Sequence, residues 1–473
     1  MNPFPGAAAD PQNPAHMFPA PAQTRAAAII ALATLAACTD PPDPPGSPFV
    51  LDRSQLDNGL ELILHEDHTV PLVYVSVWYH VGGADDVAGK SGLAHFSEHM
   101  MFEGSQHVMP GEHFRVLGVA GNPDANASTG QDRTNYFETV PPHQLETVLW
   151  LESDRMSFLL PALDQARFDN QRDVVRNERR QRLENSAFGA ESVALAAALY
   201  PPDQPFHAQV IGVHEDLQRE TLDDAREFFR QWYGPANATL LIAGDLEPKA
   251  TRALVAKWFA SLPGSGPRPV HRSWPAPALP GTFRQTVSDP FTKLSRIHYV
   301  WPSAPAGSDD DVGLDVLAAV LGLRPTGRLW QALSHGGQPV QDIGAYQASQ
   351  AGSSEFHIWV DLPPEASISA IELALRSELG RIARNAPPTD TEIRQARAAM
   401  EAAMVTRLET LGGRGELMQW YNHHLGTPDG FGWHRAGWSR ANPERLRDLA
   451  ARTLGDKRVE ITTLPAAAAA GGR

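Results

Sequence analysis

The chain has 473 residues, of which 40 are Lys or Arg and 55 are Asp or Glu, so its formal net charge is −15 at pH 7. This acidic balance, without a Lys/Arg-rich block, argues against nucleic-acid binding, because such binding needs cations that displace counterions from phosphates. The single cysteine, Cys38, excludes an internal disulfide and a cysteine-based zinc finger. Any metal must therefore be held by carboxylates and by some of the 18 histidines.

The N-terminal residues are predicted to direct and tether the chain. The apolar run 26–37 is too short to cross a hydrocarbon core of ~30 Å at ~1.5 Å per residue, and it is typical of an export signal. It ends Leu35-Ala36-Ala37-Cys38, which resembles the lipobox of bacterial lipoproteins. Residues 1–37 would then be removed and Cys38 lipidated, whereas a plain secretory signal with an incidental cysteine is the alternative. We expect a protein of the bacterial cell envelope, on the periplasmic side, with a lipid anchor in a membrane.

The rest of the chain predicts two similar mixed α/β-sandwich domains of the α+β class. A Pro-rich tether over 38–48 precedes a first domain over 49–262, and a Pro/Gly-rich linker over 263–281 leads to a second over 282–463. Residues 464–473 are expected to be a disordered tail. Strands are expected at 60–65, 70–81, 239–243, 291–301 and 356–362, and helices at 93–102, 145–160, 163–184, 248–262, 312–323, 368–385 and 390–410. Because these do not alternate strictly, a doubly wound parallel sheet fits less well.

The predicted helix over 93–102 carries the run His95-Phe96-Ser97-Glu98-His99. Residues four apart lie on one face of a helix, so His95 and His99 can bind one zinc ion. Glu98 shares that side and is placed to act on water rather than on the metal. The order inverts the commoner His-Glu-x-x-His arrangement and matches the inverzincin pattern. A pair of partly exposed surface histidines is the alternative that the motif alone leaves open.

The stretch from Gly92 to Gly104 resembles the zinc-binding helix of the pitrilysin/insulinase family of zinc metallopeptidases. The run Asp57-Asn58-Gly59-Leu60 resembles the opening of that family, and 126–136 resembles its substrate-edge strand. The resemblance implies that the substrate binds along four residues of that strand. These are Asn126, Ala127, Ser128 and Thr129.

The same resemblance places the third zinc ligand at Glu178, on a second helix. Taken alone, the Arg/Glu-rich run around Glu178 would be interpreted as a solvated helix face. At the position where the family often carries a supporting Glu, this chain has Gln171. The amide still forms hydrogen bonds but removes one negative charge from around the site, so we expect tuned rather than abolished activity.

The resemblance implies a zinc-dependent endopeptidase that hydrolyses unfolded or flexible peptides. Zn²⁺ would be held by His95, His99 and Glu178, and Glu98 would be the catalytic general base. The peptide would add as a strand to the sheet edge, a mode that binds many sequences. Two alternatives stay open: a non-catalytic assembly subunit on the same fold, and a lipid-anchored binding protein whose histidines only scavenge metal.

The resemblance also implies a partner subunit. In the family, a zinc-less half supplies an Arg and a Tyr seven residues apart, after a helix that 327–333 resembles here. The Arg position falls at Ser334 and the Tyr position at Gln341, and neither side chain brings a cation. We therefore expect a heterodimer with a zinc-less homologous subunit that carries the pair. The alternative is a monomer or homodimer in which Arg324 or Arg328 takes that role.

Two other histidine pairs lie outside the motif. The run His65-Glu66-Asp67-His68 ends a predicted strand, where side chains alternate between faces, so we expect it at the surface. His423 and His424 are adjacent and cannot share one helix face, which favours packing or partner roles over a metal site.

Overall fold

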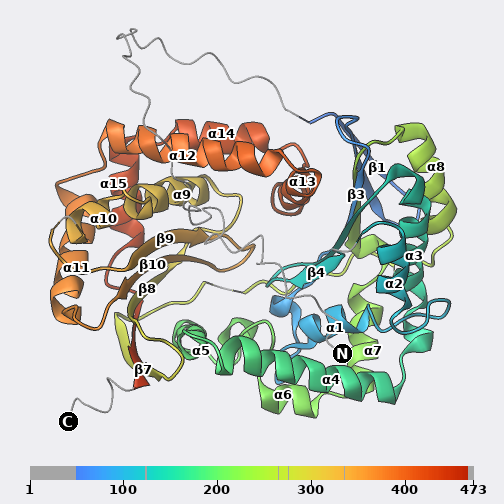
Figure 1. Cartoon of the computed structure of the whole chain (residues 1–473), viewed down its shortest axis with the longest axis horizontal. Coiled ribbons are helices and arrows are strands. Elements are labelled where there is room, and N and C mark those ends of the chain that lie inside the picture. Colours follow the sequence, from blue (N-terminus) through green and yellow to red (C-terminus); the bar gives the residue numbers. More distant parts are fainter. Residues whose placement is uncertain (1–48, 123–124, 265, 275, 335, 467–473) are drawn as a thin grey trace, which may run out of the picture.

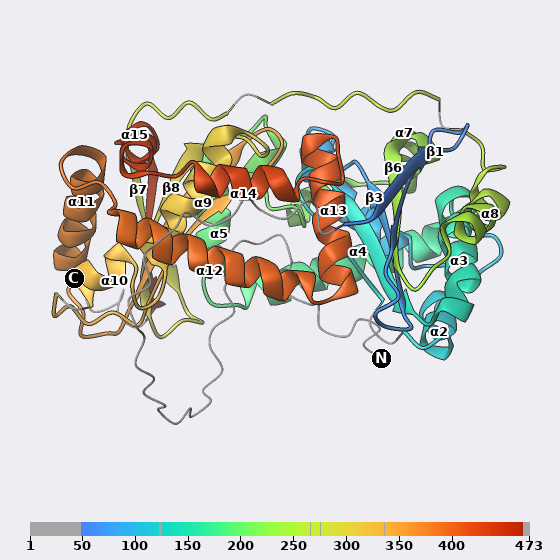
Figure 2. The same ribbon diagram turned by 90° about the horizontal axis from the view of Figure 1, so that it is seen from above.

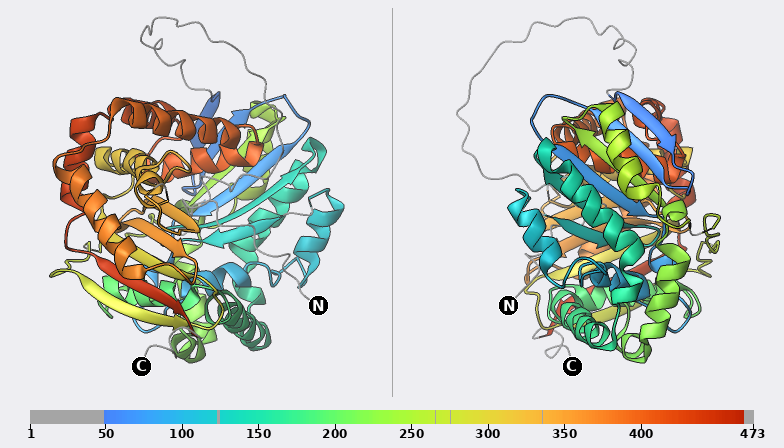
Figure 3. Two further views of the ribbon diagram at one scale, coloured as in Figure 1. Left: turned by 60° about the vertical axis from the view of Figure 1, so that its left-hand side comes forward. Right: turned by 90° about the vertical axis from the view of Figure 1, so that its right-hand side faces the viewer.

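A computed structural model describes residues 49–466, apart from 123–124, 265, 275 and 335. The predicted signal, the tether and the lipidation residue Cys38 lie outside the described residues, as does most of the predicted tail. Two mixed sheets occupy the two sides of the molecule, and each carries a layer of helices on its outer face (Figure 1; Figure 3). This architecture confirms the predicted α+β class. Among the described residues, no helix is both long enough and apolar enough to cross a bilayer.

The first sheet has the strand order β1-β2-β6-β3-β5-β4. Strands β2 and β6 are parallel, and the other neighbours are antiparallel. The central strands β3 and β6 are buried along their whole length, as their apolar sequences require. Strand β4 forms one edge of the sheet. The strands are β1 (Leu51–Gln55), β2 (Glu61–Glu66), β3 (Val73–Tyr79), β4 (Asn126–Thr129), β5 (Thr134–Val140) and β6 (Ala238–Gly244).

The second sheet repeats the first. Its order is β7-β11-β8-β10-β9, with β7 and β11 parallel and the other neighbours antiparallel. Taken in chain order, this is the arrangement β2-β6-β3-β5-β4 of the first sheet, so the edge strand β9 is the counterpart of β4. The strands are β7 (Phe283–Asp289), β8 (Ser295–Ser303), β9 (Asp342–Ala348), β10 (Ser354–Leu362) and β11 (Val459–Pro465).

The helices follow the same division in sequence. The connection between α8 and β7 contains no helix or strand among its described residues and runs along one side of the molecule (Figure 2). The helices before it are α1 (Leu93–Met100), α2 (Glu112–Val119), α3 (Leu145–Phe158), α4 (Gln165–Arg179), α5 (Gly189–Leu199), α6 (His214–Arg219), α7 (Leu222–Trp232) and α8 (Pro248–Phe259). Those after it are α9 (Asp309–Gly322), α10 (Arg328–Leu333), α11 (Ile368–Arg384), α12 (Asp390–Leu408), α13 (Leu411–Leu425), α14 (Phe431–Ser439) and α15 (Pro443–Thr453).

Two helices pack on the sheet of the other half. Helix α5 lies against β7 and β11 of the second sheet, and α13 lies against β3 and β6 of the first. Within α13, the buried Glu416 accepts hydrogen bonds from Tyr74 (2.6 Å), Ser76 (3.0 Å) and Asn135 (2.9 Å). The predicted linker therefore separates the two sheets in sequence, but the predicted domain boundaries do not separate the packing units.

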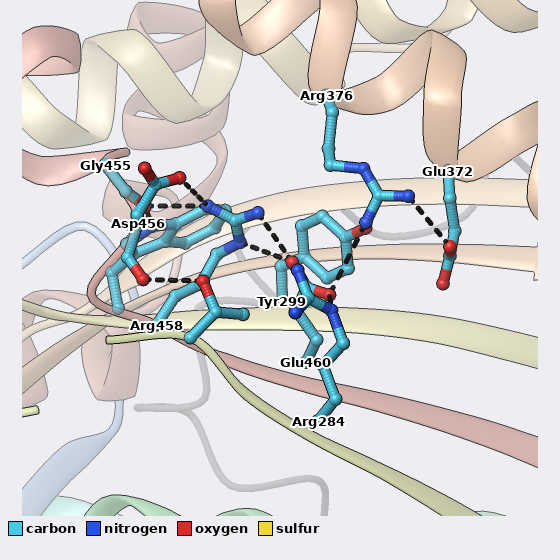
Figure 4. A network of polar contacts seen from close by, with 10 residues as sticks. Arg284, Tyr299, Glu372, Arg376, Gly455, Asp456, Arg458 and Glu460 are labelled. Atoms are coloured by element: carbon cyan, nitrogen blue, oxygen red, sulfur yellow. Dashed lines mark hydrogen bonds and ion pairs between the residues drawn. The ribbon is translucent and has the colours of Figure 1, made fainter. Parts of the chain in front are cut away.

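A polar network ties α11 to the second sheet (Figure 4). The carboxylate of Glu460 on β11 is 4% exposed and is surrounded by three guanidinium groups. Arg284 and Arg458 each contact it at 2.7 Å, and Arg376 of α11 lies 3.6 Å away. Arg376 also donates to the hydroxyl of Tyr299 on β8 (3.4 Å). These contacts link α11 to β8 and β11 within the second half.

The structure shifts several predicted boundaries. The strand expected over 70–81 begins only at Val73, because Pro71 has no N–H group for the ladder. The helix expected over 163–184 begins after Asp164, whose carboxylate caps it, and ends in a π-helical turn over Arg180–Glu184. Strand β11 extends to Pro465, so the first residues of the predicted tail belong to the sheet.

Candidate functional site

Helix α1 is held at its N-terminus by a buried carboxylate. Gly92 has φ 99°, a left-handed conformation that favours glycine, and it precedes the first helical residue. The carboxylate of Asp86 accepts the backbone N–H groups of Gly92 (2.7 Å) and Ala94 (2.8 Å), which have no partner within the helix. This cap fixes the start of the helix that carries the predicted motif.

Helix α4 packs along α1 through an apolar face. Phe168, Gln171, Val175 and Glu178 recur three or four residues apart, so they project from one side of α4. The ring of Phe168 meets that of Phe96 on α1 edge to face, with centroids 4.9 Å apart. This contact sets the spacing of the two helices and brings Glu178 opposite the histidines of α1.

The three predicted zinc ligands converge. Nε2 of His99 lies 3.1 Å from Oε2 of Glu178, and Nε2 of His95 lies 3.8 Å from the same oxygen. Both rings are almost fully buried, at 7% and 6% exposure. The structure therefore brings together residues that lie about eighty positions apart in the sequence, as the family resemblance implies.

The fourth residue of the motif, Glu98, points towards the edge of the first sheet. Its Oε2 accepts a hydrogen bond of 2.5 Å from the hydroxyl of Thr129 on β4. The other predicted substrate-binding residues, Asn126, Ala127 and Ser128, form the rest of this short edge strand. The carboxyl group of Glu98 therefore connects helix α1 to the edge strand β4.

Gln171 lies beside the site, as predicted. Its amide donates to Oε1 of Glu103 (2.5 Å). Burial opposes the charge of His99, but Glu178 above all, and Gln171 to a smaller extent, raise its pKa. The carboxyl group of Glu103 thus lies beside the amide that takes the position where the family often carries a supporting glutamate.

Burial and mutual contacts set the charges of the site. Burial lowers the pKa of His95 to about 3, so this ring is neutral and has a lone pair to share. Burial alone would raise the pKa of Glu178, but its hydrogen bond with His99 and the surrounding positive charges lower it to about 2. Burial also raises the pKa of Glu98, against the opposing effects of His99 and Thr129. Glu178 is therefore anionic, and Glu98 is the more basic carboxylate.

The donor set fits zinc. Zinc bonds of about 2.0–2.1 Å at tetrahedral angles place neighbouring ligand atoms roughly 3.3 Å apart, close to the separations of 3.1 and 3.8 Å found here. Two imidazole nitrogens and one carboxylate oxygen also match the set of catalytic zinc sites that keep a fourth position for water. His95, His99 and Glu178 are accordingly the residues that would hold Zn²⁺.

A cavity of about 430 Å³ adjoins this site. Residues 129–133 of the β4–β5 hairpin line one side of it, and the end of the other edge strand, β9, lines the opposite side. Thr129 therefore borders the cavity and also contacts Glu98. A cavity of this size is in the range of ligand sites and lies between the two sheet edges.

The other histidine pairs differ from what the sequence predicts. His65 is buried at 4% exposure and bonds to the carbonyl of Val50, so its predicted surface position is wrong, whereas His68 is exposed. His423 and His424 both face the carboxylate of Asp132, although they are adjacent. Sequence reasoning missed this grouping, because Asp132 lies in a hairpin turn far away in the chain and no local spacing links it to α13.

The chain combines two similar α+β halves with a helix that carries the inverted motif His-x-x-Glu-His. These features together define a class of two-sheet metallopeptidase folds. Residues 61–197 match the family description Insulinase (Peptidase family M16), and residues 219–400 match Peptidase M16 inactive domain. The chain belongs to this pitrilysin/insulinase family. The helix with His95, Glu98 and His99, together with Glu178, lies in the first of the two matched regions.

Several known proteins are similar to this chain in sequence or in fold. Zinc protease PqqE of Helicobacter pylori is 30% identical over 273 residues, which cover 56% of this chain and 60% of that protein. The crystal structure of a protease from Helicobacter pylori superposes with a TM-score of 0.81 at 24% identity, over 88% of this chain and 100% of that one. The first half of the periplasmic protease PqqL from Escherichia coli gives 0.74 at 19% identity, over 90% and 94%. This chain covers about half, 49%, of the complete PqqL structure.

Proposed function

We propose that this chain is the zinc-bearing subunit of an endopeptidase that cuts unfolded or flexible peptides. The observation that carries the proposal is the meeting of three elements at helix α1: a His/His/Glu donor set, the buried carboxylate of Glu98, and an edge strand that contacts this carboxylate. A structural metal site needs only the first of these elements. A peptidase needs all three.

Each residue of the candidate site has its own role in the proposed peptide hydrolysis. Zinc held by His95, His99 and Glu178 would supply Lewis acidity, which lowers the pKa of water and polarises a peptide carbonyl. Glu98 accepts the proton of the attacking water and delivers it to the leaving amine. The raised pKa of Glu98 suits both steps, because a stronger base takes the proton and the resulting acid still releases it near neutral pH.

The substrate binds by extending the first sheet. Strand β4 pairs with β5 on one side and forms the edge of the sheet on the other, so an extended peptide can add there through backbone hydrogen bonds. The adjoining cavity gives room for its side chains. Recognition of this kind selects for a flexible backbone more than for a particular sequence.

A zinc-less homologous subunit completes the active enzyme. The sequence resemblance puts the Arg/Tyr pair at Ser334, which follows the last residue of α10, and at Gln341, and neither side chain brings a cation. Arg328 is engaged by the carboxylate of Glu392 at 2.9 Å and by two backbone carbonyls. This engagement supports a partner rather than Arg328 as the source of the cation.

The proposal includes the location of the protein. We propose that Cys38 is lipidated after export, so that the folded chain is held on the periplasmic side of a membrane in the cell envelope. The lipobox supports this, and the related PqqL is described as periplasmic. Replacing Cys38 by Ser should move the protein from the membrane fraction to the soluble periplasmic fraction, whereas an unchanged distribution would contradict lipid anchoring.

The test of function is hydrolysis of an unstructured peptide library by the zinc-loaded chain, alone and with a zinc-less homologue. The alternative is a non-catalytic subunit. The observation behind it is the match of residues 219–400 to an inactive domain. That matched region does not contain the motif. Zinc binding without any hydrolysis, under both conditions, would favour the non-catalytic alternative.

A further inference from the structure

A second cluster of metal-ligating side chains lies at the turn between β4 and β5. Asp132 in this turn, and His423 and His424 in the last turn of α13, place one ligand atom each within 4.8 Å of one another. Oδ2 of Asp132 lies 3.9 Å from Nε2 of His423 and 4.0 Å from Nε2 of His424. Both separations are too long for a hydrogen bond. The carboxylate and the two rings therefore converge on a point between them rather than on one another.

Hydrogen bonds behind His423 determine where its proton lies. The hydroxyl of Thr239 donates to Glu61 (3.1 Å), so it accepts from Nε2 of His80 (2.9 Å). With Nε2 as its donor, a neutral His80 keeps Nδ1 as an acceptor, and this nitrogen lies 2.7 Å from Nδ1 of His423. Nδ1 of His423 then donates to it, which leaves Nε2 as the His423 nitrogen that faces Asp132.

This arrangement is typical of a histidine that binds a metal. In such residues one ring nitrogen donates to a fixed partner, and the other nitrogen faces the ion. The planes of the His80 and His423 rings differ by only 4°, with centroids 5.0 Å apart, so the hydrogen bond between them lies close to both ring planes and holds the His423 ring in place. The ring of His424 packs edge to face against that of His423, with centroids 4.6 Å apart, so it is held in place as well.

We propose that Asp132, His423 and His424 form a second zinc site, separate from the site on α1 and α4. The donor set is again two imidazole nitrogens and one carboxylate oxygen, which suits Zn²⁺. The two separations between Asp132 and the histidines must shorten by about 0.6–0.7 Å to reach the roughly 3.3 Å that tetrahedral zinc requires. Asp132 lines the central cavity, so an ion reaches the site from there.

The charges around the second site resemble those around the first. Arg133, the neighbouring cation, donates to the carbonyl and hydroxyl of Ser128, while Arg182 contacts Glu178 at the first site. Each group of ligands thus combines one carboxylate with one nearby guanidinium.

A third cluster shows what a non-binding group looks like. Glu66, His68 and Glu247 also lie within ligand distance of one another. Both ring nitrogens of His68, however, contact carboxylates, Glu66 at 2.9 Å and Asp245 at 2.6 Å. These hydrogen bonds raise the pKa of His68 to about 9, so the ring is protonated at neutral pH and has no lone pair for a metal.

The second site has a structural role in the molecule. Asp132 is three residues beyond Thr129, and Oδ2 of Asp132 also accepts the backbone N–H of Ala351 (3.0 Å) between β9 and β10. A metal ion here joins the β4–β5 turn to α13 and, through this bond, to the second half. It would hold the edge strand β4 in place. The inference does not depend on peptidase activity.

The test counts zinc ions in the full-length folded protein. The metal-free protein is loaded with Zn²⁺, separated from excess metal, and analysed for zinc per chain. The double variant H95Q/H99Q removes the first site, and the single variants H424Q and D132N each remove the second. H68Q is the control, because it removes a histidine from an unrelated cluster. Asp132→Asn keeps an oxygen that accepts the N–H of Ala351, so it perturbs the fold least. Circular dichroism confirms folding of each variant.

We expect two zinc ions per chain in the wild type and in H68Q, and one in H95Q/H99Q, H424Q and D132N. Combining H95Q/H99Q with D132N should leave none. In the H95Q/H99Q protein, Co²⁺ should give visible absorption bands that D132N abolishes. A wild type that saturates at one ion, with no change in D132N, would overturn the second site. Failure of the first site alone is recognised by equal zinc contents in the wild type and H95Q/H99Q.

Discussion

The hydroxyl of Thr129 donates a hydrogen bond of 2.5 Å to Glu98, so the edge strand β4 and the helix α1 share one carboxylate. In the proposed function, a peptide paired with β4 would be positioned relative to Glu98 by this hydrogen bond. Replacing Thr129 by Val removes this hydrogen bond at nearly constant volume. A hydrogen bond to a charged group contributes about 1.5–3 kcal/mol, so kcat/KM should fall by roughly ten- to a hundredfold.

Thr129→Ser is the matched control for this prediction. Serine keeps the hydroxyl and loses only a methyl group, so its kcat/KM for a quenched fluorescent peptide should stay within a few-fold of the wild type. Equal losses in T129V and T129S would show that the methyl group matters and that the hydrogen bond to Glu98 does not.

Removal of the carboxylate at position 98 should separate catalysis from metal binding. Glu98→Gln keeps the size of the side chain and can still accept the hydrogen bond from Thr129, but it cannot take up a proton. Peptide hydrolysis should fall by about 10²–10⁴, the usual contribution of a general base. Zinc content should be unchanged, because Glu98 is not among the converging ligand atoms. Turnover equal to that of the wild type would refute the assignment of Glu98 as the base.

The contact of α13 with the first sheet should be a major source of stability. Glu416 is buried and accepts hydrogen bonds from four side chains of the first half, namely Tyr74, Ser76, Trp78 and Asn135. Glu416→Ala leaves these donors without their acceptor, so the free energy of unfolding should fall by about 2–4 kcal/mol. Denaturant unfolding measures the change. Glu365 is exposed, and Glu365→Ala should alter stability by less than about 0.5 kcal/mol.

A buried carboxyl group should make the protein less stable in alkali. Glu220 is 2% exposed, and burial followed by the charges of Asp86, Asp216 and Asp224 raises its pKa to about 9. The folded state therefore holds a proton that the unfolded chain loses near pH ~4.3. Stability from this group is complete below that pH and is lost as the pH rises towards about 9.

Glu220→Gln tests this pH dependence. The neutral amide does not titrate, so the metal-free variant should lose less unfolding free energy between pH 6 and 9 than the wild type does, by about 1–3 kcal/mol. Urea unfolding at several pH values measures the difference. Parallel pH profiles for the two proteins would show that Glu220 is ionised in the folded state.

The sequence predicts the members of the candidate zinc site on α1 and α4 to different extents. His95 and His99 lie within one helix, where a spacing of four residues suffices to predict a shared face. Glu178 sits in a run of Arg and Glu whose local pattern indicates only a solvated helix, so the resemblance to a family was needed to single it out. Its place was then set by packing, through the contact of Phe168 with Phe96.

Long-range packing was beyond the sequence. The strand and helix patterns predict the two halves, but nothing in them shows that α13 covers the first sheet or that α5 covers the second. For the same reason the grouping of Asp132 with His423 and His424 could not be predicted. An adjacent histidine pair fails the helical spacing rule, yet both rings reach one carboxylate at the last turn of α13, which a third element supplies.

The last prediction concerns the missing cation. Losing a donor that stabilises an oxyanion slows acyl transfer by about 10²–10³, and Ser334 and Gln341 supply no positive charge. Arg328 is held by Glu392, and the guanidinium of Arg324 stacks on Trp330 at 4.7 Å from the ring centroid. The zinc-loaded chain alone should therefore cleave peptides slowly, and a zinc-less homologue that carries the Arg/Tyr pair should raise kcat by about 10²–10³.

Two controls make this prediction specific. A homologue whose Arg and Tyr are replaced by Ser and Gln, the residues found here at positions 334 and 341, should bind this chain but leave its activity low. Adding the intact homologue to the E98Q chain should also give no hydrolysis, because the general base is then absent from both subunits. Full activity of this chain by itself, unchanged by the homologue and reduced by Arg328→Ala in protein that still folds, would show that the cation is supplied from within the chain.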